Sequence, residues 1–137
     1  QESVLSRMEA NVQGQRVYAE KNDCLAFLEL DDSFHAAIFL AADKAMSWEL
    51  IQSMSGHYRR VRIMSLWDTA ILNKVMLQHE QILKKIQEKD LSAVHMLLRD
   101  HFINIVSVEQ KLLQSYPDYF KKVQNEDFLM RDFLSLL

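Results

Sequence analysis

Glycine and proline are nearly absent from this chain, which has two glycines and one proline among 137 residues. Tight β-hairpins depend on glycine, asparagine and proline at fixed turn positions, so few of them can form here. The chain is rich in residues that favour helices, and 49% of it is hydrophobic, which is enough to bury a core. The sequence therefore predicts an all-α fold: one domain over residues 1–137, built as an antiparallel bundle of about six to seven helices.

Apolar residues recur at helical spacing along five stretches of the chain. Asp23 and Asp90 precede the second and the fifth stretch, where an aspartate caps a helix well. Gly56 weakens the third stretch, and Pro117 ends the fifth. The apolar residues after Pro117 suit one or two short amphipathic helices. The five predicted helices cover about residues 3–19, 24–42, 47–67, 71–88 and 90–114.

The charge of the chain argues against binding to DNA or to a membrane by this segment alone. Its formal net charge is -3, and no apolar run approaches the ~18 residues of a spanning helix. The single cysteine, Cys24, fits a reducing compartment and a buried, unreactive thiol. We expect a soluble, cytoplasmic protein. Because the chain starts at Gln1 and enters a helical pattern at once, we also expect a segment to be missing upstream.

Three histidines and one aspartate form a candidate metal site. Asp31 and His35 are four residues apart, so a helix places both side chains on the same face. His79 and His101 each lie in the middle of an apolar helical pattern and should face inward. Three imidazoles and a carboxylate suit Zn²⁺ or another late first-row cation. Each histidine could equally be a core residue that satisfies one hydrogen bond, so the residues alone leave the choice open.

A second group of polar residues could hold a ligand beside this site. Tyr58, Arg59, Arg62 and Ser65 lie at helical spacing on one side of the third predicted helix. A guanidinium group matches a carboxylate through two hydrogen bonds, which favours an anionic ligand. Asn104 falls one turn after the last candidate histidine and joins this set. The alternative is that the arginines form a solvated basic stripe.

Four motifs occur in order along residues 23–110 and together resemble the FCD domain. This is the C-terminal effector-binding domain of FadR-type regulators in the GntR family. The resemblance rests on Asp31-Asp32-Ser33-Phe34-His35, on Arg59-Arg60-Val61-Arg62, on the run from His79 to Asp90, and on His101-Phe102. One departure is Asp43, which stands where that family often has asparagine.

The resemblance implies a metal centre and an organic-acid effector. In the metal-binding branch of that family, the residues matching Asp31, His35, His79 and His101 bind a divalent metal, commonly zinc or nickel. Small carboxylates complete the coordination and change the DNA affinity of a homodimer through an N-terminal winged helix-turn-helix domain, which this chain lacks. The expected function is therefore effector sensing in a bacterial transcription regulator, with no catalytic residue.

Two alternatives belong to other classes of protein. A metal-dependent enzyme acting on a small carboxylate would need a general base beside the metal ligands. Glu80 adjoins His79 in sequence, but successive helical residues point about 100° apart, so its carboxylate should lie away from the site. The other alternative is a metal-free helical interaction domain in which the histidines are core residues.

Overall fold

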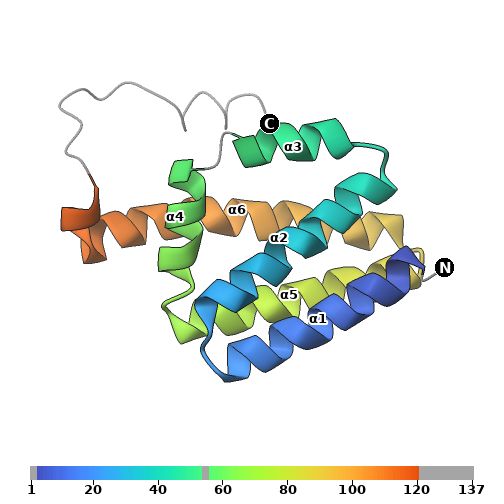
Figure 1. The fold of residues 1–137 in the computed structure, drawn as a ribbon, viewed down its shortest axis with the longest axis horizontal. Helices are drawn as coiled ribbons and strands as arrows, with labels where there is room; N and C mark the ends of the chain where they lie inside the picture. The colour runs from blue at the N-terminus through green and yellow to red at the C-terminus, as the bar shows by residue number, and fades with distance from the viewer. Residues whose placement is uncertain (1–2, 54–55, 121–137) are drawn as a thin grey trace.

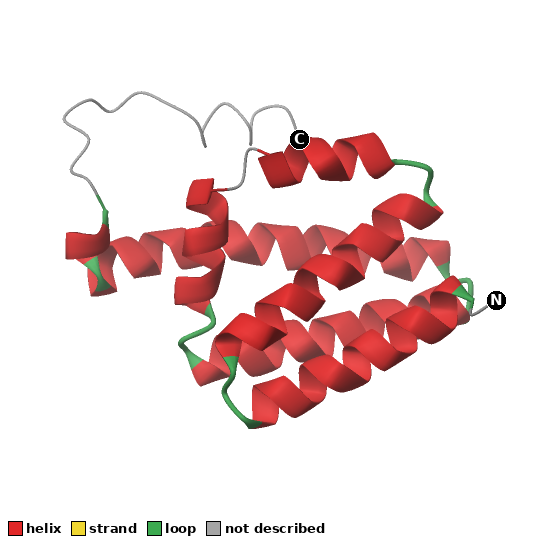
Figure 2. Ribbon diagram, in the orientation of Figure 1, coloured by secondary structure: helices red, strands yellow, loops and turns green. Residues whose placement is uncertain are grey.

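The computed structural model describes residues 3–53 and 56–120, apart from the side chains of His57 and of residues 104–107 and 109–110. Over these ranges the chain forms helices and no strand, as Figure 2 shows, which confirms the all-α prediction. The helices are α1 (Val4–Glu20), α2 (Cys24–Ala41), α3 (Ala45–Ser53), α4 (Gly56–Ser65), α5 (Thr69–Gln87) and α6 (Leu91–Ser115), followed by a 3₁₀ helix, η1 (Pro117–Tyr119). The tail helices expected beyond η1 lie outside the described residues.

Four long helices, α1, α2, α5 and α6, form the body of the bundle. Helix α1 packs on α2 and α5, and α5 packs on α6, with successive partners antiparallel in Figure 1. The predicted caps are confirmed, because the carboxylates of Asp23 and Asp90 accept hydrogen bonds from the backbone amides of Ala26 and Ala93. None of the helices in the described ranges is long and apolar enough to cross a membrane.

The prediction of one long third helix is wrong. Helix α3 ends at Ser53 and α4 begins at Gly56, and the two run in different directions in Figure 1. Two local features favour the break: glycine is a poor helix former, and the Ser53 hydroxyl donates to the Leu50 carbonyl, which satisfies an acceptor at the helix end. The preceding turn forms with Asp43 in place, at a φ of 56°. The break lets α4 cross α2 and α6 instead of extending α3.

The apolar core contains two groups of buried residues. One joins the start of α2 to the start of α5, and the other joins α1 to the later parts of α2 and α5. Five polar residues are buried along with them in the described part of the chain, which is costly unless each finds a partner. The five are Gln15, Asp31, His35, His79 and His101.

Candidate metal centre and adjoining cavity

The four predicted metal ligands come together in the structure. Helix α2 carries Asp31 and His35, α5 carries His79, and α6 carries His101. A ring nitrogen of each histidine lies within 4.8 Å of one from each of the others. Nε2 of His79 is 3.4 Å from Nε2 of His101 and 3.3 Å from Oδ1 of Asp31. The same Asp31 oxygen is 3.8 Å from Nε2 of His35, so the Asp31 carboxylate adjoins a cluster of three histidine nitrogens that come from three helices.

The two shortest distances between these groups, and the protonation of the histidines, fit a late first-row divalent cation. With metal–nitrogen bonds of 2.0–2.1 Å, neighbouring donors of a tetrahedral site are separated by about 3.3 Å. Burial lowers the pKa of His35, lowers that of His79 well below its usual value, and lowers that of His101 to about 4. The imidazoles are therefore neutral near pH 7, the form that binds metal.

Gln15, which was not predicted as a site residue from the sequence, orients the imidazole of His79. Its Oε1 atom lies 2.7 Å from Nδ1 of His79, while its amide nitrogen faces Oδ1 of Asn11 at 2.8 Å and the Leu30 carbonyl at 3.5 Å. A carbonyl can only accept, so the amide nitrogen belongs on that side and Oε1 accepts from His79. His79 therefore carries its proton on Nδ1, and the lone pair of Nε2 points at the other donors. Oε1 of Gln78 stands 3.0 Å from Nδ1 of His101 in the same way.

Arg62 holds the carboxylate of Asp31 in place. Its guanidinium group donates to Oδ2 of Asp31 and, at 2.6 Å, to Oδ1 of Asp32, which leaves Oδ1 of Asp31 facing the histidines. Burial works against the charged form of Arg62, but the two aspartates outweigh it and raise its pKa. Arg59 donates to the other oxygen of Asp32. Asp32 is thus a second residue of the site that was not predicted from the sequence.

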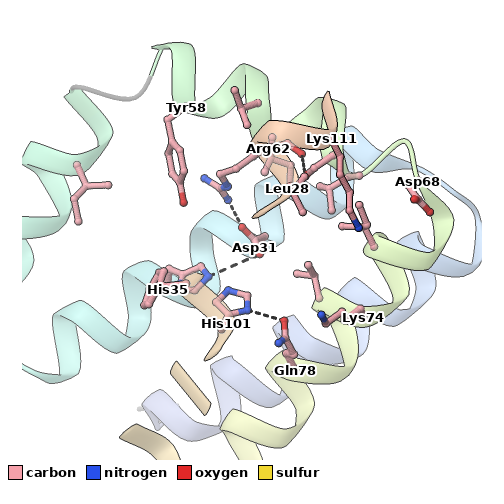
Figure 3. Close-up of a pocket in the computed structure, with 18 of the residues that line it drawn as sticks. Leu28, Asp31, His35, Tyr58, Arg62, Asp68, Lys74, Gln78, His101 and Lys111 are labelled. Carbon is pink, nitrogen blue, oxygen red and sulfur yellow. Dashed lines mark hydrogen bonds and ion pairs between the residues drawn. The ribbon is translucent and has the colours of Figure 1, made fainter. Parts of the chain in front are cut away.

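A cavity of about 360 Å³ adjoins the metal centre and is drawn in Figure 3. Among the predicted ligand-binding residues, Tyr58, Arg62 and Ser65 line this cavity, as do Asp31, His35 and His101 from the metal centre. Arg59 is not among the lining residues and borders a separate, shallower depression with Arg60. The side chain of Asn104, on α6, lies outside the described residues.

Two other titratable side chains that the structure describes, those of His95 and Glu80, do not belong to this centre. His95 is exposed on α6, and the side chain of His57 is outside the described part. Glu80, the nearest acidic residue in sequence to His79, forms an ion pair with Arg16 of α1. Trp48 of α3 lines the cavity and stacks against His35 with ring centroids 6.4 Å apart.

Comparison with known proteins assigns the family. The FCD domain model matches residues 1–104. The HTH-type transcriptional repressor RspR of Escherichia coli (strain K12) is 29% identical over 121 residues. The uncharacterized HTH-type transcriptional regulator YdfH of Shigella flexneri and that of Escherichia coli O6:H1 are equally similar. Each alignment covers 88% of this chain and 53% of the relative, so the chain spans about half the length of these curated relatives. The chain belongs to the FCD domain family.

Proposed function

We propose that this chain is the effector-sensing domain of a bacterial transcription regulator and binds a divalent metal, zinc or nickel, together with a small carboxylate. One observation carries the proposal: three buried histidine nitrogens from three helices, with the buried Asp31 carboxylate beside two of them, lie next to a cavity that an arginine also lines. Nδ1 of His79 and Nδ1 of His101 each face a glutamine oxygen, so the two Nε2 lone pairs face each other at 3.4 Å and a cation is their natural partner.

The metal ligands in this proposal are Oδ1 of Asp31 and one ring nitrogen of each of His35, His79 and His101. When bound, a divalent cation would supply positive charge and, by expanding its coordination beyond these four donors, a position for an anionic ligand. Other residues of the chain fix the positions and the protonation of the donor atoms. Arg62 fixes Asp31 through its other oxygen, and Gln15 fixes the tautomer of His79.

The carboxylate of the effector is proposed to bind between the metal centre and α4. Arg62, Tyr58 and Ser65 line the cavity there, and the guanidinium of Arg62 lies 5.5 Å from the centroid of the Tyr58 ring. An entering carboxylate can share the Arg62 guanidinium with Asp32. Arg59, which pairs with Asp32, contributes by keeping that aspartate in position. Asn104 completes the proposed set from α6.

Effector binding is proposed to change the DNA affinity of the regulator, although a different part of the regulator contacts the DNA. Residues lining the cavity come from α2, α3, α4, α5 and α6, so a ligand there can favour one arrangement of these helices over another. Only a difference in affinity between two arrangements can shift their populations. Residues 1–137 act in this proposal as one sensing domain of a homodimer, and a helix-turn-helix domain outside this chain contacts DNA.

Sensing is favoured over catalysis by two observations. The three similar proteins are named as transcriptional regulators, and Glu80, the acidic residue adjoining His79, forms an ion pair with Arg16. Nothing in this arrangement requires a bound ligand to be converted. A carboxylate that binds to the zinc-loaded protein should therefore be recovered chemically unchanged.

The test is the metal dependence of carboxylate binding. The chain is stripped of metal with a chelator, and its melting temperature is measured with acetate alone, with zinc alone and with both. We expect acetate to raise the melting temperature of the zinc-loaded protein and to leave the metal-free protein unchanged. An equal shift in both samples, or consumption of the acid by the loaded protein, would contradict the proposal.

A further inference from the structure

We infer that the effector has an apolar body of several carbons behind its carboxylate, and not a chain of hydroxyl groups as in a sugar acid. This inference rests on the proposed carboxylate-binding function and concerns the rest of the same cavity. The lining of the cavity combines residues of the candidate metal centre with aliphatic side chains and with exposed charged side chains, several of which are labelled in Figure 3.

Aliphatic side chains form part of the cavity wall. Leu28 of α2 and Leu66, just after α4, are 1% and 4% exposed and belong to the same core group. Ile71 and Val75 continue this wall along α5, and Val108 faces the cavity from α6. These five side chains carry no hydrogen-bonding group, so a ligand body that lies against them has to be apolar or leave its polar groups unpaired.

Three polar side chains that line the cavity near the candidate metal centre already have partners. Arg62 donates to Asp31 and Asp32, Gln78 faces His101, and the Ser65 hydroxyl donates to the Arg62 carbonyl at 2.7 Å. This part of the cavity can bind one carboxylate, but it has few remaining donors for a row of hydroxyls.

Three charged residues also line the cavity and are exposed to solvent. They are Asp68, Lys74 and Lys111, which include both signs of charge. In Figure 3, Asp68 and Lys74 lie on the opposite side of the cavity from His35. Water can hydrate any ligand group beside these exposed residues, so they do not require that part of the ligand to be polar or charged. The aliphatic wall therefore sets the chemistry of the ligand body.

Hexanoate and gluconate represent the two kinds of ligand, one with an apolar body and one with a chain of hydroxyl groups. Both are six-carbon monocarboxylates, and gluconate differs by its five hydroxyl groups. Each methylene buried against the aliphatic wall should strengthen binding about fourfold, whereas each hydroxyl placed there without a partner should weaken it. Acetate serves as the reference, since it carries the carboxylate with almost no body.

The experiment measures the affinity of the zinc-loaded chain for the three acids by calorimetric titration, with the bound zinc assayed before and after. We expect hexanoate to bind at least about tenfold more tightly than acetate and gluconate. Gluconate binding as tightly as hexanoate, or hexanoate binding no better than acetate, would overturn the inference and leave the carboxylate site intact. If none of the three acids binds, the proposed function fails as well.

Variants test whether the wall itself makes the difference. Val75→Thr replaces a methyl group by a hydroxyl of similar size on the wall, and Val94→Thr makes the same change at a half-buried α6 residue that does not line the cavity. Val75→Thr should lower the ratio of hexanoate to acetate affinity by about threefold or more, and Val94→Thr should leave this ratio unchanged. If Val75→Thr fails to fold, Ile71→Val removes one methylene from the same wall and should lower the ratio in the same direction. An unchanged ratio in the folded wall variant would overturn the inference.

Discussion

The side chain of Gln15 accepts a hydrogen bond of 2.7 Å from Nδ1 of His79, and both residues are fully buried. This contact connects α1, which carries none of the four proposed metal ligands, to the centre of the site. Partners of this kind fix the tautomer and the ring orientation of a metal-binding histidine. Helix α1 is therefore part of the proposed metal centre as well as part of the core.

Substitution Gln15→Leu tests this role of α1. The change keeps a side chain of similar size but leaves Nδ1 of His79 without an acceptor. We expect the zinc affinity to fall about 10- to 100-fold, as for other partners of metal-binding histidines. Competition with a chromophoric chelator measures the affinity, and circular dichroism before each titration confirms that the variant is folded.

Gln13→Leu is the matched control, because Gln13 is exposed on the same helix. It should bind zinc as the unmodified chain does. If Gln15→Leu also retains the full zinc affinity while folded, the hydrogen bond to His79 has no part in preparing the site. The role of Gln15 would then be confined to packing between α1 and α5.

The stability of the metal-free protein should depend on the buried histidines at mildly acid pH. Burial lowers the pKa of His101 to about 4, whereas an unfolded histidine titrates near 6.5. Between these values the unfolded state binds more protons than the folded state, so the free energy of unfolding falls as the pH falls. The loss due to His101 begins below about pH 6.5 and amounts to about 3 kcal/mol once the pH has passed below 4.

Urea unfolding of the metal-free protein, repeated from pH 7 to pH 4.5, measures this decrease in the free energy of unfolding. The variant His101→Leu should show a shallower decline than the unmodified chain, since it lacks one of the groups that titrate. His95→Leu, a change at an exposed histidine of the same helix, should keep the original slope. Identical slopes for all three proteins would contradict the assignment of the decline to His101.

Two arginines of α4 should differ in their effect on ligand binding. Arg62 lines the cavity and contacts Asp31, whereas Arg59 contacts Asp32 and does not line the cavity. Arg62→Gln should therefore weaken acetate binding to the zinc-loaded protein by about tenfold or more, through loss of a charged hydrogen-bonding group. Arg59→Gln should weaken it by less than about threefold, because a partly exposed ion pair is worth little. A larger loss at Arg59 would contradict the proposed placement of the carboxylate.

The helices could be predicted from the sequence because their signals are local. Capping aspartates precede α2 and α6, and the apolar spacing of α5 and α6 is regular over several turns. The break between α3 and α4 was not predicted, since a single glycine weakens a helix without deciding where it ends. Its position depends on how α4 packs against α2 and α6, which is a tertiary effect.

The proposed metal ligands could be predicted from residue type and spacing, but their partners could not. Gln15 did leave a signal, because it stands in the buried stripe formed by Met8, Val12 and Ala19, where a polar residue requires an explanation. Sequence alone does not show that this stripe faces His79, which is 64 residues away. The pairing of Asp32 with two arginines likewise depends on how α2 and α4 cross.

The most direct test of the proposed metal centre is a calorimetric titration of the metal-free chain with zinc. We predict that one equivalent of zinc binds, and that a hundredfold excess of zinc over the dissociation constant stabilises the fold by about 2.7 kcal/mol. His101→Leu should lose this binding, and His95→Leu should retain it. Less than about a tenth of an equivalent bound by the unmodified chain, or equal binding by His101→Leu, would contradict the metal centre.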